Sequence, residues 1–441
     1  MYPNLYYVFK DWFGVEWHAL SFINTFGLLV AFSFIVAAWV LSAELRRKEK
    51  QGFFSPKEET IVVGSPASWS DLLMNGFIGF AFGYKIAGVI FSKPVEVDAQ
   101  TYIFSGEGSL IGGVGMALFL VGLKWWEKQK VRLKQPEKRV IRIWPHDRVG
   151  DFVVLGLIFG ILGAKLFDNF EHWDEFIAHP IERLLSQSGL AFYGGLIVAA
   201  IAICWYAAKK SISVQHLVDA AAPALMIAYA IGRLGCQLSG DGDWGVYNSA
   251  YVSDAYGQVS IAQHGQFEQK LQQNTLYFTQ GKTIENGQEI YVTDRTYPTI
   301  EQVPHRSVQG PSFLPTWLFA YSYPMNVNKD GNPIPGVTED HNKVLPLPVF
   351  PTPLYEFIVC TMLFFILWAF RKSFKAPLAM FGLYLSMNGF ERILMELIRV
   401  NNSYGVLGIR ITQAEWIAGF LLVSGLGLMW FASKHMPKTA Q

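Results

Sequence analysis

The chain has 441 residues, of which 51% are hydrophobic and 16% are charged, and its formal net charge is +1. Soluble chains carry about 25% charged residues, so this composition excludes an ordinary soluble protein and is typical of an integral membrane protein. The near-neutral charge gives no indication of a nucleic-acid partner, and three cysteines do not make a disulfide framework. The first residues are aromatic rather than basic, so we expect no cleavable signal peptide.

Apolar segments of about 20 residues, the length that crosses a bilayer, recur along the chain. We expect nine membrane spans, at residues 19–42, 72–91, 108–126, 150–167, 190–208, 217–234, 354–370, 376–397 and 412–432. The sixth span is short, and the eighth is interrupted by Asn388, Glu391 and Arg392. The predicted fold class is an all-α polytopic integral membrane protein with about nine transmembrane helices.

Basic residues cluster after the odd-numbered predicted spans, which is the pattern of cytoplasmic loops. The clusters lie within residues 46–50, 124–139, 209–210, 371–375 and 434–438, whereas the loop after the fourth span is acidic. We therefore expect the N-terminus outside the cell and the C-terminus in the cytoplasm.

The first half of the chain contains an internal repeat. The residues Asp71, Gly76, Gly83 and Lys85 match Asp151, Gly156, Gly163 and Lys165 at a constant offset. Each set is followed by a loop and a glycine-rich span, and such small residues allow close helix packing. We interpret residues 71–126 and 151–208 as a duplicated helix pair, although glycine-rich membrane helices also resemble one another without duplication.

Residues 246–350 differ from the rest because they are polar and rich in Gln, Asn, Tyr and Pro. Alternating stretches such as 288–293 predict strands, so we expect an extracytoplasmic insert with mixed or β-containing structure. This divides the chain into an N-terminal membrane part (1–245, including the extra pair 71–126), the insert (246–350) and a C-terminal membrane part (351–441).

Residues 232–245, which follow the sixth span, contain one arginine, two aspartates and five glycines. Arg233 at the end of a membrane span is costly without an anionic partner, and a lipid phosphate matches its planar fork. Glycines such as Gly232 allow close backbone approach to a ligand. We therefore predict that Arg233 binds a lipid phosphate.

A second polar group lies in the eighth span. On a helix, Arg392, Glu396 and Arg399 share one face, and they lie on the same predicted side of the membrane as Arg233. They form either an ion pair that makes the helix insertable or part of a site, and we favour the site. Asp219, in the sixth span, is either functional or a helix cap.

Four motifs resemble the bacterial prolipoprotein diacylglyceryl transferase family. They are the stretch 232–245, Arg392-x-x-x-Glu396-x-x-Arg399, Pro351-x-x-Leu354-Tyr355-Glu356 and Phe192-Tyr193-Gly194-Gly195-Leu196. Together they cover about 150–245 and 350–432, whereas the insert and the pair 71–126 have no counterpart in shorter members. Many members have histidine where Tyr193 stands, asparagine where Cys236 stands, and glutamate where Asp241 or Asp243 stands.

The resemblance implies that phosphatidylglycerol donates its diacylglyceryl group to the lipobox cysteine thiol of a preprolipoprotein signal peptide, at the outer leaflet of the bacterial inner membrane. A thioether forms and glycerol phosphate leaves. Arginines aimed at the phosphate would stabilise the charge that develops there, and we assign this role to Arg233 and Arg392.

The remaining assignments rest on the same motifs. Tyr193 acts as a base or orients the phosphate, and Glu396 and Asp241 hold the arginines in place, with Asp243 as a weaker candidate. We expect the other substrate-binding residues to be Gly194, Gly195, Gly232, Tyr355, Glu356 and Arg399. His18, His172 and His179 lie on the predicted outer side, where surface roles are favoured over proton transfer.

No metal or cofactor site is predicted, because the histidines lack ligand spacing and no Cys-x-x-Cys occurs. Two alternatives to a transferase stay open. A transporter of an anionic or lipid solute would also use broken helices and buried arginines, and a non-catalytic relative could bind lipoprotein precursors.

Overall fold

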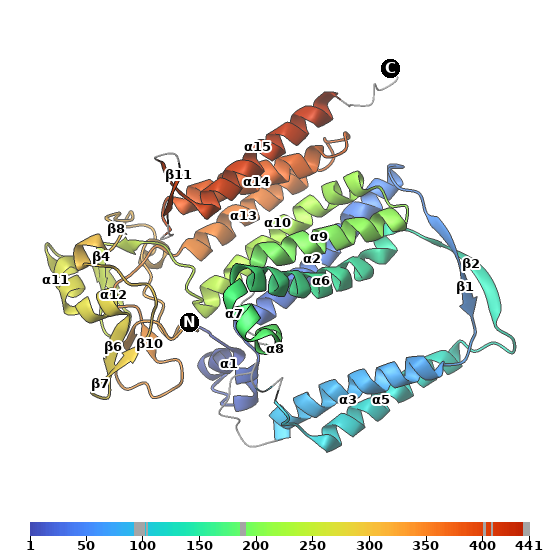
Figure 1. Ribbon diagram of the computed structural model, residues 1–441, viewed down its shortest axis with the longest axis horizontal. Coiled ribbons are helices and arrows are strands. Elements are labelled where there is room, and N and C mark those ends of the chain that lie inside the picture. Colours follow the sequence, from blue (N-terminus) through green and yellow to red (C-terminus); the bar gives the residue numbers. More distant parts are fainter. Residues whose placement is uncertain (92–101, 103–104, 186–190, 400–402, 407–408, 435–441) are drawn as a thin grey trace. The chain divides into compact units, whose positions relative to one another are not determined.

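The computed structural model describes the chain except for residues 92–101, 103–104, 186–190, 400–402, 407–408 and 435–441. Helices dominate the fold (Figure 1). They are α1 (Leu5–Phe13), α2 (Thr25–Lys50), α3 (Trp69–Phe91), α5 (Leu110–Lys130), α6 (Val149–Glu171), α7 (Trp173–Ala178), α8 (Pro180–Leu185), α9 (Phe192–Lys209), α10 (Val214–Ser239), α11 (Gln266–Gln273), α12 (Thr275–Gln280), α13 (Thr352–Phe370), α14 (Ala379–Glu396) and α15 (Gln413–Lys434).

The strands are short and form two-stranded sheets. They are β1 (Lys57–Val63), β2 (Glu137–Ile143), β3 (Tyr247–Asn248), β4 (Tyr251–Ser253), β5 (Val259–Ile261), β6 (Lys282–Glu285), β7 (Gln288–Tyr291), β8 (His305–Arg306), β9 (Asn332–Pro333), β10 (Lys343–Val344), β11 (Ser403–Val406) and β12 (Ile409–Thr412). The pairs β1–β2, β4–β5, β6–β7, β9–β10 and β11–β12 are antiparallel, and β3–β8 is parallel.

Within the described residues, seven helices are long and apolar enough to cross a membrane. They are α2, α3, α5, α6 with the turn before it, α10, α13 and α15. This confirms a polytopic membrane protein with small sheets, but it does not confirm the predicted count of nine spans. The described part of α9 is a shorter apolar helix, and α14 contains three charged side chains in its last turns, Glu391, Arg392 and Glu396.

The chain forms two compact units, which are described separately. The first, called unit 1, consists of Met1–Gly14, Asn24–Val40 and Val218–Gln441. The second, called unit 2, consists of Val15–Ile23 and Leu41–Leu217.

In unit 2, two helix pairs pack through glycines at matching positions. A Cβ at Gly83 of α3 would lie 2.3 Å from the carbonyl oxygen of Gly112 in α5, and one at Gly163 of α6 would lie 2.5 Å from that of Gly194 in α9. Both pairs are also joined by one N–H to carbonyl bond at the start of the second helix, Ser109 to Tyr84 and Ala191 to Ala164. These shared contacts support the interpretation of a duplicated helix pair.

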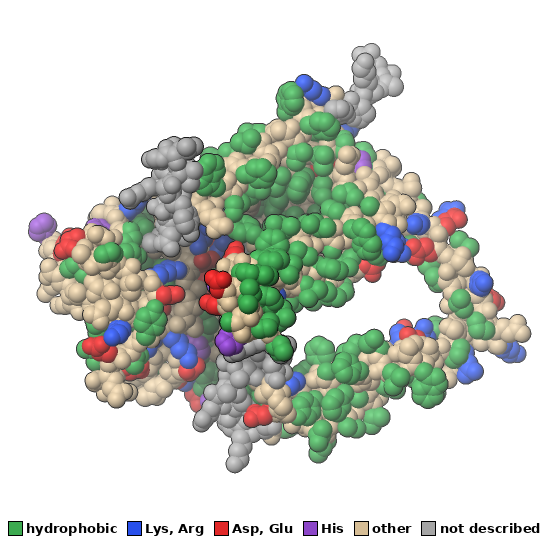
Figure 2. Space-filling view, viewed as in Figure 1, with side chains coloured by type: hydrophobic (Ala, Val, Ile, Leu, Met, Phe, Trp, Pro, Cys, Tyr) green, Lys and Arg blue, Asp and Glu red, His purple; other side chains and the backbone are tan. Residues whose placement is uncertain are grey.

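The α3–α5 pair exposes apolar side chains, and Figure 2 shows them covering its visible face. Exposed members include Phe77, Phe82, Ile111 and Leu118. The antiparallel ribbon β1–β2, which runs from Lys57 opposite Ile143 to Val63 opposite Glu137, connects to the start of α3 and to the end of α5. Lipid is the medium in which such an all-round apolar surface is favourable.

Unit 1 contains the insert and the helices that carry the site. Twelve buried apolar residues form the core of the insert region, among them Phe278, Tyr323 and Leu345, and Trp244 of the preceding loop belongs to the same core. The predicted strand at 288–293 is present as β7. Helices α14 and α15 lie side by side (Figure 1), because Gly382, Gly389 and Gly425 allow their backbones to touch.

Candidate active site

A single buried carboxylate, that of Glu356, lies at the centre of three arginines in unit 1. Its side chain is 0% exposed and projects from the second turn of α13. Its Oε2 atom lies 2.8 Å from Nε of Arg233. Its Oε1 atom accepts hydrogen bonds from Nη1 of Arg392 at 3.1 Å and from Nη1 of Arg399 at 3.4 Å. Arginines that are far apart in the sequence therefore converge on one group.

Asp243 is the second carboxylate that bridges arginines. It accepts hydrogen bonds from Nη1 of Arg233 and, at 2.7 Å, from Nη2 of Arg399. Burial alone would raise the pKa of Asp243, but Arg233 and Arg399 outweigh burial and hold this pKa below its ordinary value. Asp243 therefore stays ionised as a fixed counter-charge for both arginines.

Glu396 completes the group. Its Oε2 lies 3.6 Å from Nη2 of Arg392, one helical turn earlier in α14, and its Oε1 accepts a 2.7 Å bond from the Thr412 hydroxyl. We refer to these six side chains as the arginine–carboxylate cluster: Arg233, Arg392, Arg399, Asp243, Glu356 and Glu396. Arg392 and Glu396 share a face of α14, whereas Arg399 lies beyond the end of this helix and reaches Glu356 from there.

The loop after α10 brings the cluster together because glycines let it turn sharply. Gly240 and Gly242 have φ values of 68° and 93°, which L side chains adopt only with strain. Gly245 then donates its N–H to the Phe350 carbonyl and forms a β-bridge with Arg399. A Cβ added at Gly245 would lie 2.6 Å from the Ile398 carbonyl oxygen, so only glycine fits there. The loop is thus held against the ends of α13 and α14, which places Asp243 between the arginines.

The hydroxyl of Thr352, the first residue of α13, donates a 2.6 Å bond to the backbone carbonyl of Asp243. From the insert, Arg295 donates to the carbonyl of Gly242 and lies over the ring of Trp244. The insert therefore contacts the backbone of the loop that carries Asp243. A polar pocket of about 290 Å³ opens at this contact and is lined by Gly242, Arg295 and Asp330 among others.

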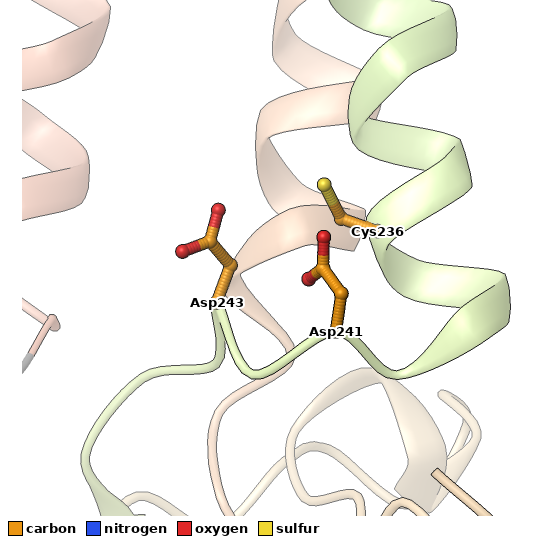
Figure 3. Close-up of side chains that lie close together, drawn as sticks. All are labelled: Cys236, Asp241 and Asp243. Carbon is orange, nitrogen blue, oxygen red and sulfur yellow. The ribbon is translucent and has the colours of Figure 1, made fainter. Parts of the chain in front are cut away.

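Asp241 lies in a different arrangement from the one expected. Its side chain lies beside that of Cys236, and Figure 3 shows Cys236 on α10 and both aspartates on the loop that follows. Among the described residues, Cys236, Asp241 and Asp243 could together hold a metal ion, because one ligand atom of each lies within 4.8 Å of those of the other two. A cation there would compete with Arg233 and Arg399 for Asp243. Burial raises the pKa of Asp241.

The other expected substrate-binding residues are not members of the arginine–carboxylate cluster. Tyr355 donates a 2.6 Å hydrogen bond to the Leu318 carbonyl of the insert. Gly232 lies in α10, and nothing lies within 4 Å of an added Cβ there. Tyr193, Gly194 and Gly195 belong to α9 in unit 2.

Within unit 2, Gly194 and Gly195 allow α9 to approach α6, since an added Cβ would lie 2.3 Å from the Phe167 side chain and 2.8 Å from the Gly160 carbonyl oxygen, respectively. The Tyr193 side chain is exposed. The histidines His18, His172 and His179 also belong to unit 2.

Asp219 is a helix cap, although not of its own helix. From α10 its two carboxylate oxygens accept 2.9 Å bonds from the backbone N–H groups of Leu378 and Phe381, at the start of α14. These N–H groups have no partner inside the helix, and the carboxylate favours the positive end of the helix dipole. This side chain orients the helix that carries Arg392.

Sequence reasoning missed two features of the site. It placed Glu356 among the substrate-binding residues but did not identify it as the common partner of the arginines. It also named Glu391 only as an interruption of the eighth span and gave it no role in the site, although Glu391 is 1% exposed and lies in α14 next to Arg392. The available signal for Glu391 was an acid inside an otherwise apolar span.

Comparison with known proteins places this geometry in context. Residues 116–431 match the family model described as prolipoprotein diacylglyceryl transferase. A protein of Leptospira interrogans named phosphatidylglycerol–prolipoprotein diacylglyceryl transferase is 25% identical over 278 residues, which are 57% of this chain and 61% of the relative. Proteins of the same name from Enterococcus faecalis (33% over 127 residues; 29% of this chain, 41% of the relative) and Streptococcus pyogenes (34% over 90 residues; 20% and 35%) are also similar. The chain thus spans about three fifths, or less, of the length of these curated relatives.

Proposed function

Because the chain belongs to the prolipoprotein diacylglyceryl transferase family, we propose that it transfers the diacylglyceryl group of phosphatidylglycerol to the lipobox cysteine thiol of preprolipoproteins. The name that these relatives share supports both substrates. In this reaction a carbon–sulfur bond forms, a carbon–oxygen bond breaks, and glycerol phosphate leaves.

The observation that carries the proposal is the convergence of Arg233, Arg392 and Arg399 on the buried carboxylate of Glu356. A lipid phosphate is an anion that can take over the guanidinium forks. When the carbon–oxygen bond breaks, the phosphodiester becomes a monoester and gains negative charge. Guanidinium groups already in place bind the transition state, in which this charge develops, more tightly than the ground state. This lowers the activation barrier of the transfer.

In this proposal Arg233 and Arg392 bind the phosphate, and Arg399 supports them. Glu396 and Asp243 hold the arginines in place, so Asp243 takes the role first expected of Asp241. Glu356 is the group that the phosphate displaces. For Tyr193, Gly194 and Gly195 the support is the family motif alone, and we assign Tyr193 to orienting the donor by hydrogen bonding.

The placement in the membrane is part of the proposal. We place the protein in the bacterial inner membrane with nine spans, α9 and α14 included, the N-terminus outside and the C-terminus in the cytoplasm. The basic clusters after the odd-numbered spans support this orientation. Residues 246–350 are then extracytoplasmic between membrane parts 1–245 and 351–441, and the cluster opens toward the outer leaflet.

The test is transfer by the purified full-length protein in detergent, with phosphatidylglycerol and a lipobox peptide, followed by the mass of the peptide. The proposal predicts a gain of one diacylglyceryl group on the cysteine. Arg233→Ala should fold, with an unchanged elution profile, and should lower turnover by about 10²–10³-fold. Binding of lipid and peptide without a mass gain would instead indicate a non-catalytic relative, and binding of neither would favour a transporter.

A further inference from the structure

Glu391 is a buried acid that the mechanism above does not use. Its side chain is 1% exposed, and neither carboxylate oxygen has a hydrogen-bond partner among the residues that the structure describes. The neighbouring carboxylates differ, because Asp243 and Glu356 bind arginines and Glu396 binds Arg392 and a threonine hydroxyl. Glu391 therefore has hydrogen-bonding capacity that none of the described protein groups takes up.

The groups around Glu391 come from three helices. Glu356 and Cys360 face it from α13, and Tyr229 and Arg233 face it from α10. On its own side of the site, the charges of Arg392 and Arg399 act on it, and Glu396 lies further along α14. Glu391 is thus next to the arginine–carboxylate cluster without being one of its ion-pair members.

The charge balance of the cluster indicates the protonation state of Glu391. Arg233, Arg392 and Arg399 supply three positive charges, and their ion-pair partners Asp243, Glu356 and Glu396 supply three negative ones. No guanidinium group is left over for a further carboxylate. Burying an unpaired carboxylate costs several kcal/mol, whereas the neutral acid avoids this cost. The resting arrangement therefore favours a proton on Glu391.

We propose that Glu391 is the general acid that protonates the departing glycerol phosphate. A phosphate that replaces Glu356 among the guanidinium groups comes to lie beside Glu391. As the sulfur–carbon bond forms, the electron pair of the breaking carbon–oxygen bond goes to the phosphate oxygen, and that oxygen takes the proton of Glu391. The proton that the sulfur loses then restores the acid, so no further reactant is needed.

This proposal rests on the proposed transferase function, and it explains how the site limits its negative charge. Without a proton donor, the released monoester would leave the balanced cluster with two additional negative charges. Proton transfer moves one of these charges from the phosphate to Glu391, and the proton that the thiol loses then neutralises Glu391, so only one additional charge stays in the site. General acids contribute about 10²–10⁴-fold to rate.

The first variant is Glu391→Gln, which keeps the shape and the neutral charge but has no proton to transfer. We expect kcat to fall by about 10²–10⁴-fold while KM for phosphatidylglycerol stays the same. Glu391→Asp should retain part of the turnover because it restores a carboxylic acid. Glu44→Gln is the control for the loss of a buried carboxyl group: Glu44 of α2 is 2% exposed and pairs with Arg47 outside the cluster, so this variant should lose stability but keep its turnover.

A pH profile separates proton transfer from a structural role. Wild-type kcat should fall at alkaline pH, where the acid ionises, and Glu391→Gln should lack this alkaline limb. Turnover of Glu391→Gln within threefold of wild type, with the same profile, contradicts the role of Glu391 while leaving the transferase function in place. A wild-type kcat that does not fall at alkaline pH also contradicts the role of Glu391, even if the variant fails to fold. Absence of transfer by the wild type contradicts the transferase function and, with it, this role.

Discussion

The substitution Glu356→Gln tests whether one carboxylate holds the site together. The variant keeps the size of the side chain but removes the charge that three guanidinium groups share. Removing one partner of a buried ion pair costs about 3–5 kcal/mol, because the other charge stays buried and uncompensated. Asp243 still serves Arg233 and Arg399 in the variant, so we expect a loss within this range rather than a multiple of it.

The assay is thermal unfolding of purified protein in detergent. With about 2 °C per kcal/mol, the low end for domains of 150–250 residues, the expected fall in Tm is about 6–10 °C. The matched control is Asp340→Asn, which breaks the 2.5 Å pair with Lys329 at the surface, where the aspartate side chain is 72% exposed. Exposed pairs are worth about 0–1 kcal/mol, so its Tm should fall by no more than about 2 °C.

A lipid phosphate should also compensate for the missing carboxylate. Ligands that bind only the folded state raise its stability, and Glu356→Gln offers guanidinium groups with fewer protein partners. Phosphatidylglycerol should therefore raise the Tm of this variant more than that of wild type. Equal Tm losses for Glu356→Gln and Asp340→Asn, with no extra response to the lipid, would refute the reasoning that Glu356 is the shared partner.

Three further outcomes follow from the structure. Gly163→Ala should destabilise the protein by about 1–3 kcal/mol, the cost of overpacking, because its Cβ would meet the Gly194 carbonyl, whereas Gly160→Ala has open space and should be neutral in the same Tm measurement. Asp219→Ala should cost about 0.5–2 kcal/mol through the lost cap, and an unchanged Tm would contradict the capping role. Burial lowers the pKa of His341 below 6.5, so the folded state binds fewer protons than the unfolded one. The free energy of unfolding should therefore show no loss from this group above pH 6.5 and should fall as the pH drops below it. His341→Gln should remove this acid-side loss from the Tm-versus-pH curve, and an unaltered curve would count against it.

Much of the site was predictable because its spacing is local. The face shared by Arg392, Glu396 and Arg399 follows from helical periodicity, and the need of Arg233 for an anion follows from the cost of a charge in a membrane. In the structure Arg233 lies beside Glu356, and Arg392 and Glu396 share a face of α14, whereas Arg399 follows the end of that helix. The glycine pattern likewise indicated close helix pairs, although their duplication stayed one of two interpretations.

The tertiary pairings were not predictable. Whether Asp241 or Asp243 meets Arg233 depends on the positive φ values of Gly240 and Gly242, which rotate successive side chains to different sides of the loop. Composition could also not show that Asp219 caps α14, because that contact joins segments far apart in the sequence. The polar end of α14 lowers its hydropathy, which is why its status as a span stays a proposal.

The most direct measurement is ³¹P NMR of phosphatidylglycerol incubated with the purified protein and a lipobox peptide, with the same peptide carrying serine in place of cysteine as the control. The proposed transferase function predicts that a phosphate monoester signal grows with the cysteine peptide at the rate at which the thioether forms. No such signal should grow with the serine peptide. A phosphodiester signal that stays constant with both peptides, while the wild-type protein is folded and binds them, would contradict it.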